Sequence, residues 1–170
     1  FLVSGITEAV AQSGAYKLMV MNLMTQDGET EGYTAADHLR ELLRHGAPGM
    51  VDGCLANSSP IPEHLQEEYL REGADVMKID RERVEAQGVK LYTAPLLSSR
   101  CEYARHDPIL LTQAIMEVFN QQARRRKRRI SSPPCAKRVS LSAISSCRAL
   151  IITCVSPSAR MSRWISLSPR

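Results

Sequence analysis

The segment that decides the fold is KLMVMNL, residues 17–23. This compact apolar run lies between turn-forming and polar residues, as is typical of a strand buried on both faces of a parallel sheet. Similar apolar runs occur over residues 50–56, 74–79 and 89–93, and segments with helical signals separate them. Because strands alternate with helices along the chain, the sequence predicts an α/β fold with a mainly parallel sheet.

Helix signals appear between and after these runs. Thr34 followed by Asp37 fits a capping box, and Gly46 suits the end of the helix that starts there. Asp107-Pro108 marks the start of the last helix. We expect helices over residues 5–12, 34–45, 62–71, 80–86 and onward from 107.

Charge divides the chain near residue 123. Residues 1–123 carry ten Lys and Arg against eighteen Asp and Glu, whereas residues 124–170 carry twelve basic residues and no acid. We therefore expect an α/β domain over residues 1–122, followed by a basic Ser/Arg/Pro-rich tail over residues 123–170. A segment that cannot neutralise its own charge resists compaction, so we expect the tail to be disordered or to be translated out of frame.

The composition excludes two classes of protein. No apolar run reaches the length that a membrane-spanning helix needs. The five cysteines form no C-x-x-C pair and are odd in number, which argues against a disulfide framework and against a zinc site. Cys54 falls in a predicted strand and is expected to be buried there. We interpret the chain as a cytoplasmic protein with reduced thiols.

The polar stretch after the first predicted strand, NLMTQDGETEGYTAADH over residues 22–38, is the main candidate for chemistry. Ligands of open α/β sheets bind beyond the carboxyl ends of the strands. Gly28 and Gly32 permit tight turns and a close approach of the backbone to a ligand. The helix start at residues 34–37 offers N–H groups that suit a phosphate. Neutral donors and acceptors come from Asn22, Thr25, Gln26, Thr30 and Tyr33.

This stretch matches neither of the known glycine-rich phosphate loops, so an ordinary polar loop stays open as the alternative. A second candidate is CEYARHDPI, residues 101–109, where Arg105 and the following helix start together suit an anion. An ion pair of Arg105 with Asp107 is the alternative. Tyr69 suits stacking on a base or sugar, with core packing as the alternative. We predict no catalytic residue and no metal ligand, and a binding module is favoured over an enzyme.

At residues 22–38 the sequence resembles the YvcK-type gluconeogenesis factor family, within the CofD-like group that includes the 2-phospho-L-lactate transferases. Two further stretches match in order and spacing, IPEHLQEEYLREGADVMKID over residues 61–80 and RHDP over residues 105–108. The resemblance covers about residues 1–122 and implies a Rossmann-like three-layer sandwich. Members of the family carry two Gly-rich phosphate loops before the point where Phe1 stands. We therefore expect an N-terminally truncated, C-terminal portion of such a protein, followed by an unrelated tail.

The resemblance also implies a function. It implies a nucleotide-sugar ligand such as UDP-N-acetylglucosamine, or a dinucleotide, with no required cofactor. It further implies a cytoplasmic bacterial regulator of gluconeogenesis, peptidoglycan synthesis and cell shape, non-catalytic, with regulatory protein partners and self-association. By the same resemblance, the pocket is lined by Asn22, Thr25, Gln26 and Tyr33, and the nucleotide sugar is contacted by Tyr69 and Arg105.

Two other functions stay open. One is an enzyme of the 2-phospho-L-lactate transferase type, which joins a phospho-lactyl group to a deazaflavin alcohol in cofactor synthesis. The other is nucleic-acid binding through the RRRKRR run at residues 124–129, because such a run neutralises phosphates regardless of sequence.

Overall fold

The computed structural model describes residues 5–98, 102–131 and 149–153, with side chains described over 5–98 and 102–128. The elements in chain order are α1 (Ile6–Gln12), β1 (Tyr16–Val20), α2 (Ala35–His45), β2 (Gly53–Asn57), α3 (Glu63–Arg71), α4 (Arg81–Glu85), β3 (Lys90–Ala94), α5 (Pro108–Ser131) and β4 (Ala149–Thr153). The strands form one parallel sheet in the order β3-β2-β1-β4.

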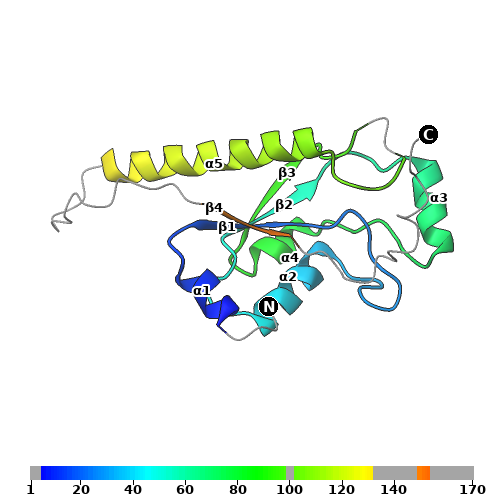
Figure 1. Cartoon of the computed structure of the whole chain (residues 1–170), viewed down its shortest axis with the longest axis horizontal. Helices are drawn as coiled ribbons and strands as arrows, with labels where there is room; N and C mark the ends of the chain where they lie inside the picture. Colours follow the sequence, from blue (N-terminus) through cyan, green and yellow to red (C-terminus); the bar gives the residue numbers. More distant parts are fainter. Residues whose placement is uncertain (1–4, 99–101, 132–148, 154–170) are drawn as a thin grey trace, which may run out of the picture.

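The helices lie in layers about this sheet. In Figure 1, α5 runs along one side of the sheet, and α1, α2 and α4 lie on the opposite side. The short helix α3 lies beyond the carboxyl ends of the strands (Figure 1). The predicted α/β class, with a parallel sheet between two helical layers, is therefore confirmed.

Three of the four predicted strands are confirmed as β1, β2 and β3, but the one predicted over residues 74–79 is wrong. This segment makes only two isolated bridges, one to Met24 and one to Thr34. The Met77 N–H donates to the Leu23 carbonyl at 3.0 Å. The segment therefore runs beside the loop that follows β1 and does not extend the sheet, and burial of Met77 against that loop explains its apolar pattern.

The expected boundary at residue 122 falls inside a helix. The helix α5 has 24 residues and continues through the basic run to Ser131, because Arg and Lys are good helix formers and suit a helix C-terminus. The strand β4 pairs in parallel with β1, with Ala149 opposite Tyr16. Residues 123–131 are thus helical and residues 149–153 form a strand, while disorder or out-of-frame translation of the tail stays a prediction. The rest of that prediction, over residues 132–148 and 154–170, lies outside the described residues.

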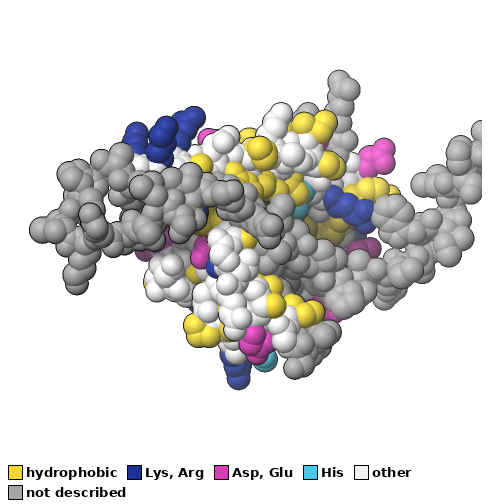
Figure 2. All heavy atoms as spheres, turned by 60° about the vertical axis from the view of Figure 1, so that its left-hand side comes forward, with side chains coloured by type: hydrophobic (Ala, Val, Ile, Leu, Met, Phe, Trp, Pro, Cys, Tyr) yellow, Lys and Arg dark blue, Asp and Glu magenta, His cyan; other side chains and the backbone are white. Residues whose placement is uncertain are grey.

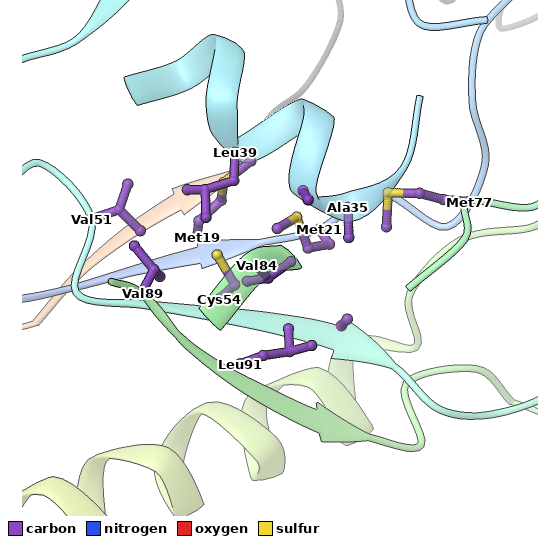
Figure 3. Packing of buried hydrophobic residues seen from close by; sticks show 12 residues of the cluster. Met19, Met21, Ala35, Leu39, Val51, Cys54, Met77, Val84, Val89 and Leu91 are labelled. Atoms are coloured by element: carbon purple, nitrogen blue, oxygen red, sulfur yellow. The ribbon is translucent and has the colours of Figure 1, made fainter. Parts of the chain in front are cut away.

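The largest buried cluster fills the space between the sheet and helices α2 and α4. Figure 3 shows Leu39 of α2 pointing toward Met19 of β1, with Val84 of α4 nearby. Cys54 of β2 lies in the same cluster, as predicted for a buried strand residue, and burial raises the pKa of its thiol to about 12. Its thiol therefore serves packing and is not a poised nucleophile.

A second cluster lies between the sheet and α5. Leu18 and Leu55 point to this side, since neighbouring strand residues face opposite ways, and they pack against Ala114 and Val118 of α5. With both faces covered, the sheet is a rigid support for the loops at its carboxyl edge.

Candidate functional site

The loops after β1 and β3 meet helix α3 in a third apolar cluster at the carboxyl edge of the sheet. Leu23 and Met24, which follow β1, are buried in it, and Tyr69 and Ala104 pack against it. The remaining members are Ile61, Leu65, Leu97 and Val76. The cluster therefore brings the start of the loop at residues 22–38 and the 104–105 segment to one side of the molecule.

Tyr69 and the segment that carries Arg105 meet in this cluster, and contact of either side chain with a nucleotide sugar stays a prediction. Burial raises the pKa of the Tyr69 phenol, while a hydrogen bond with the Ala104 backbone and the charge of Arg105 act in the opposite direction. The Arg105 side chain is exposed, and its guanidinium carbon lies 5.8 Å from the centre of the Tyr103 ring. The ring beside the Arg105 guanidinium is thus that of Tyr103, while Tyr69 packs against Ala104 in the apolar cluster.

Asn57, at the end of β2, fixes the loops on either side of it. Its side-chain amide donates to the Ser59 carbonyl at 2.7 Å, and its side-chain oxygen accepts from the N–H groups of Ser59 and Leu96. The Leu96 carbonyl in turn accepts from the Asp107 N–H at 2.8 Å. Asn57 therefore positions the start of α5, a role that the sequence analysis missed although an asparagine at a strand end is a recognisable signal.

Two of the predicted ligand-binding hydroxyls are used inside the protein. The Thr25 hydroxyl is bound to the backbone of Asp75, donating to its carbonyl and accepting from its N–H at 2.9 Å. The Thr30 hydroxyl accepts from the Gln26 N–H at 2.9 Å. Both threonines therefore shape the loop, and their contact with a ligand stays a prediction.

The other predicted loop residues occupy different positions. Gly28 and Gly32 both have positive φ, as expected of glycines in tight turns. The Tyr33 ring packs edge-on against His38, with 5.5 Å between the ring centres. Asn22 is half-buried directly after the sheet ladder ends.

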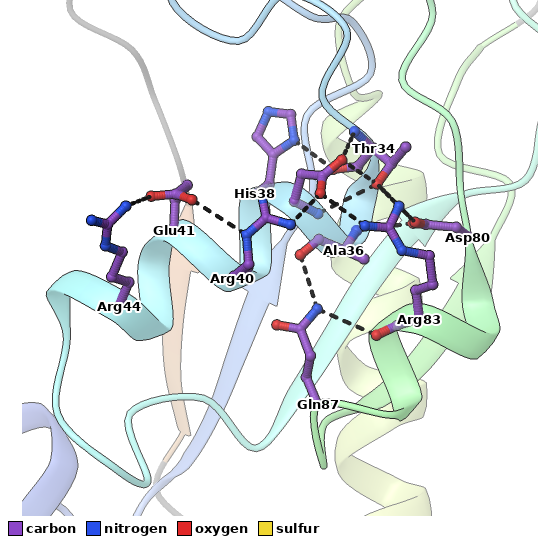
Figure 4. Close-up of polar contacts among 10 residues, drawn as sticks. Thr34, Ala36, His38, Arg40, Glu41, Arg44, Asp80, Arg83 and Gln87 are labelled. Atoms are coloured by element: carbon purple, nitrogen blue, oxygen red, sulfur yellow. Dashed lines mark hydrogen bonds and ion pairs between the residues drawn. The ribbon is translucent and has the colours of Figure 1, made fainter.

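The N-terminus of α2 is occupied by carboxylates of the protein itself (Figure 4). Asp37 completes the predicted capping box with Thr34. Asp80, at the start of α4, accepts from the Ala36 N–H at 2.9 Å and from the Thr34 hydroxyl at 2.7 Å. Arg83 binds both carboxylates. The expectation that this helix start seats a phosphate is therefore wrong, because two carboxylates already fill it.

The N–H groups at the start of α5 are likewise bound by a carboxylate of the protein. The Asp107 carboxylate accepts from the N–H groups of Ile109 at 2.8 Å and Leu110 at 3.1 Å. The expected clamp of one anion between Arg105 and this helix start is therefore wrong in its helix half, because those N–H groups already have a partner. At this point of the site, the positive charge that an anion would meet is the guanidinium of Arg105.

Three buried side-chain atoms have no hydrogen-bond partner in the part of the chain that the structure describes: Gln26 Oε1, His38 Nε2 and His106 Nε2. All three belong to the two candidate loops, at residues 22–38 and 101–109. Burial lowers the pKa of His106, which favours its neutral ring. His38 lies in the predicted stretch at residues 22–38 but was not among its predicted ligand-binding residues, although its place beside Ala35 and Leu39 on the inward side of α2 was a usable signal.

The ionised Asp37 carboxylate is expected to make the free energy of unfolding depend on pH. The Thr34 backbone N–H, then the Thr34 hydroxyl and then Arg40 and Arg83, hold the pKa of Asp37 well below its usual range. A group with a lowered pKa stabilises the fold above its unfolded-state value, about 3.9, and this contribution is lost as the pH falls further.

We therefore expect urea unfolding to show a loss of stability below about pH 4 that is smaller in Asp37→Asn. Glu67→Gln, at a mostly exposed side chain of α3, serves as the control and should keep the unsubstituted pH dependence. Equal pH dependence in Asp37→Asn and the unsubstituted chain would show that Asp37 contributes nothing to it.

The basic run forms an exposed helical end. The described side chains Arg124, Arg125, Arg126, Lys127 and Arg128 are all exposed, and Figure 2 shows Lys and Arg side chains gathered at the upper left of the face in view. Nucleic-acid binding by this run stays a prediction.

The described residues offer neither a metal site nor a membrane span. No group of three His, Cys, Asp or Glu side chains there is arranged to hold a metal ion. Within the same ranges, no helix is both long enough and apolar enough to cross a membrane.

Comparison with known proteins agrees with the geometry. A family model described as "2-phospho-L-lactate transferase CofD" matches residues 1–97, more than half of the chain. The chain belongs to the CofD family. The predicted resemblance to the CofD-like group is therefore confirmed.

Curated relatives of this CofD-family chain are named gluconeogenesis factors. One from Halalkalibacterium halodurans is 37% identical over 116 residues, which cover 68% of this chain and 36% of the relative. One from Bacillus subtilis is 32% identical over 120 residues, covering 71% of this chain and 38% of the relative. A crystal structure of a UPF0052-family protein from Bacillus halodurans matches with a TM-score of 0.64 and 36% identity, over 68% of this chain and 37% of that one. The CofD-family chain thus spans little more than a third of the length of these relatives.

Proposed function

We propose that this chain binds a nucleotide sugar, with UDP-N-acetylglucosamine as the leading ligand. We further propose that it acts as a cytoplasmic regulator of central carbon metabolism and cell-wall synthesis and not as a catalyst. The relatives named gluconeogenesis factor support a regulatory role. Because the chain spans little more than a third of their length, the activity of the whole protein is part of the proposal.

The observation that carries this proposal is the set of unpartnered buried atoms in two neighbouring loops. Buried polar atoms of native proteins have partners with few exceptions, and each exception needs an explanation. Gln26, His38 and His106 supply all such atoms over the described residues. A ligand that reaches both loops would supply the missing partners.

Tyr69 and Arg105 add the chemistry that a nucleotide sugar requires. A guanidinium binds a phosphate through short, charge-assisted hydrogen bonds. A tyrosine ring offers an apolar face to a base or sugar together with a polar hydroxyl. Because Tyr69 packs against the same apolar cluster as Ala104, the neighbour of Arg105 in the chain, the two side chains suit a diphosphate and the sugar or base next to it.

The proposal predicts that UDP-N-acetylglucosamine raises the melting temperature of the 170-residue chain and that Arg105→Ala binds it at least about tenfold more weakly. A hydrogen bond to a charged group contributes about 1.5–3 kcal/mol, and 1.4 kcal/mol corresponds to tenfold in affinity. Isothermal titration calorimetry measures the two dissociation constants. Arg105→Lys keeps the charge without the planar fork and should bind with intermediate affinity.

Arg71→Ala provides a matched control, because Arg71 is a mostly exposed arginine of α3. It should bind the nucleotide sugar as the unsubstituted chain does. An undiminished affinity in Arg105→Ala would remove Arg105 from the site, and an unsubstituted chain that does not bind would overturn the proposed function.

The two alternatives can be separated from this function. The family description names a transferase, and product formed from a deazaflavin alcohol and an activated phospho-lactyl donor would favour that enzyme. Nucleic-acid binding through the exposed basic run would weaken steeply with added salt, in proportion to the number of phosphates contacted.

A further inference from the structure

His38, in the first turn of α2, carries a buried side-chain nitrogen without a hydrogen-bond partner among the described residues. The side chain is 6% exposed. Its Nδ1 lies 2.9 Å from the Thr34 carbonyl oxygen. A carbonyl only accepts, so Nδ1 carries a proton, and in the tautomer with this single proton Nε2 has a lone pair. Nε2 has no partner among the described residues, so the atom that would satisfy it is a hydrogen-bond donor.

Gln26, in the loop between β1 and α2, also lacks a hydrogen-bond donor for its side-chain oxygen among the described residues. Its side-chain oxygen is a pure acceptor, is buried, and has no donor within the described part of the chain. Two buried acceptors, one on the loop after β1 and one in the first turn of α2, therefore both lack a donor among the described residues. A phosphate oxygen, which is itself an acceptor, satisfies neither.

The charges around this loop also disfavour a phosphate. Residues 18–39 contain no Lys or Arg. Asp27, Glu29 and Glu31 are exposed on the loop. The start of α2 is filled by the carboxylates of Asp37 and Asp80, and the nearby Arg40 and Arg83 are already paired with these carboxylates. The anionic part of a ligand is attracted instead to Arg105, on the other loop.

We propose that the loop after β1 and the first turn of α2 bind the uncharged, hydrogen-donating end of the ligand through Gln26 Oε1 and His38 Nε2, with the ligand phosphates held on the Arg105 side. This inference rests on the proposed function. It states in which orientation the ligand binds, with its phosphates near Arg105 and its uncharged end near His38 and Gln26. The donors are hydroxyl or N–H groups, which either the N-acetyl sugar or the uridine supplies.

Two variants of the full chain test this directly. His38→Asn keeps an N–H near the Nδ1 position for the Thr34 carbonyl but removes Nε2. Gln26→Met keeps the length of the side chain but removes the acceptor. Calorimetric titration with UDP-N-acetylglucosamine should show affinity lowered about tenfold in each variant, the equivalent of one hydrogen bond. The same titration is made in parallel with UDP.

Comparing UDP-N-acetylglucosamine with UDP shows which part of the ligand donates the hydrogen bonds to His38 and Gln26. A loss confined to UDP-N-acetylglucosamine assigns the sugar to the loop after β1, and an equal loss for UDP assigns the uridine. In the free chain, Gln26→Met should not lower the melting temperature, because it removes a buried acceptor that has no partner. His38→Gln, which restores an acceptor near the Nε2 position, should recover part of the affinity.

His64→Asn, at an exposed histidine of α3, is the matched control and should change neither affinity. If His38→Asn and Gln26→Met bind both ligands as tightly as the unsubstituted chain does, the inference is wrong and the proposed function survives. If the unsubstituted chain binds neither ligand, the proposed function is overturned and this inference with it.

Discussion

Replacing Leu39 by alanine is expected to lower the free energy of unfolding by about 3 kcal/mol, within the range of about 2–5 kcal/mol measured for buried leucines. Leu39 is fully buried between α2 and the sheet, next to Met19 and Val84. Removing its three outer carbon atoms leaves a cavity that the rigid sheet cannot close. Urea unfolding followed by circular dichroism measures the difference.

Leu70→Ala makes the same substitution at a leucine that is 65% exposed, and it should change stability by no more than about 0.5 kcal/mol. If Leu39→Ala unfolds the chain outright, Leu39→Met tests the same position at nearly constant volume and should cost less than about 1.5 kcal/mol. Equal stability of Leu39→Ala and Leu70→Ala would contradict the packing between α2 and the sheet.

Replacing Asp80 by alanine is expected to cost about 2 kcal/mol, the upper part of the range for a lost helix cap. Its carboxylate binds the Ala36 N–H and the Thr34 hydroxyl of α2 and also pairs with Arg83 of α4. The substitution leaves the Ala36 N–H without a partner and removes the polar contacts that join α2 to α4 through Asp80. Urea unfolding measures the loss, and Asp80→Asn, which keeps one acceptor oxygen, should lose less.

Glu82→Ala is the control, because Glu82 is an exposed acid of the same short helix. A double-mutant cycle of Asp80→Ala with Thr34→Ala should show coupling, since the two side chains share one hydrogen bond. Independent, additive losses would show that Asp80 does not act on the start of α2.

Much of the fold could be predicted because its signals are local. The apolar run at residues 17–23 and the capping box of Thr34 and Asp37 each lie within a few residues, and both were found as predicted. The segment at residues 74–79 has the same apolar character, but its partner is the loop after β1 and not a strand. Periodicity reports that a segment is buried and does not report what buries it.

In the candidate site, too, features with local sequence signals were predicted and contacts between distant residues were not. The loop at residues 22–38 and Arg105 were found from sequence, since turn glycines and motif spacing are local. The closure of α2 by Asp80 could not be found that way, because the carboxylate lies 44 residues beyond the Ala36 N–H that it binds. The capping of α5 by Asp107 is a local contact, and the Asp-Pro pair already carried its signal.

The pairing of β4 with β1 limits where this chain can be shortened for crystallisation or for fusion to a reporter. A chain cut at residue 122 would end where Gln122 binds the Tyr92 hydroxyl and would lose the last turns of α5. A chain cut after Ser131 would keep α5 but uncover the whole backbone edge of Tyr16–Val20. Because a bare strand edge recruits strands from other molecules, a trimmed version needs a replacement edge, such as a fused short strand or a lysine-rich cover, to stay monodisperse.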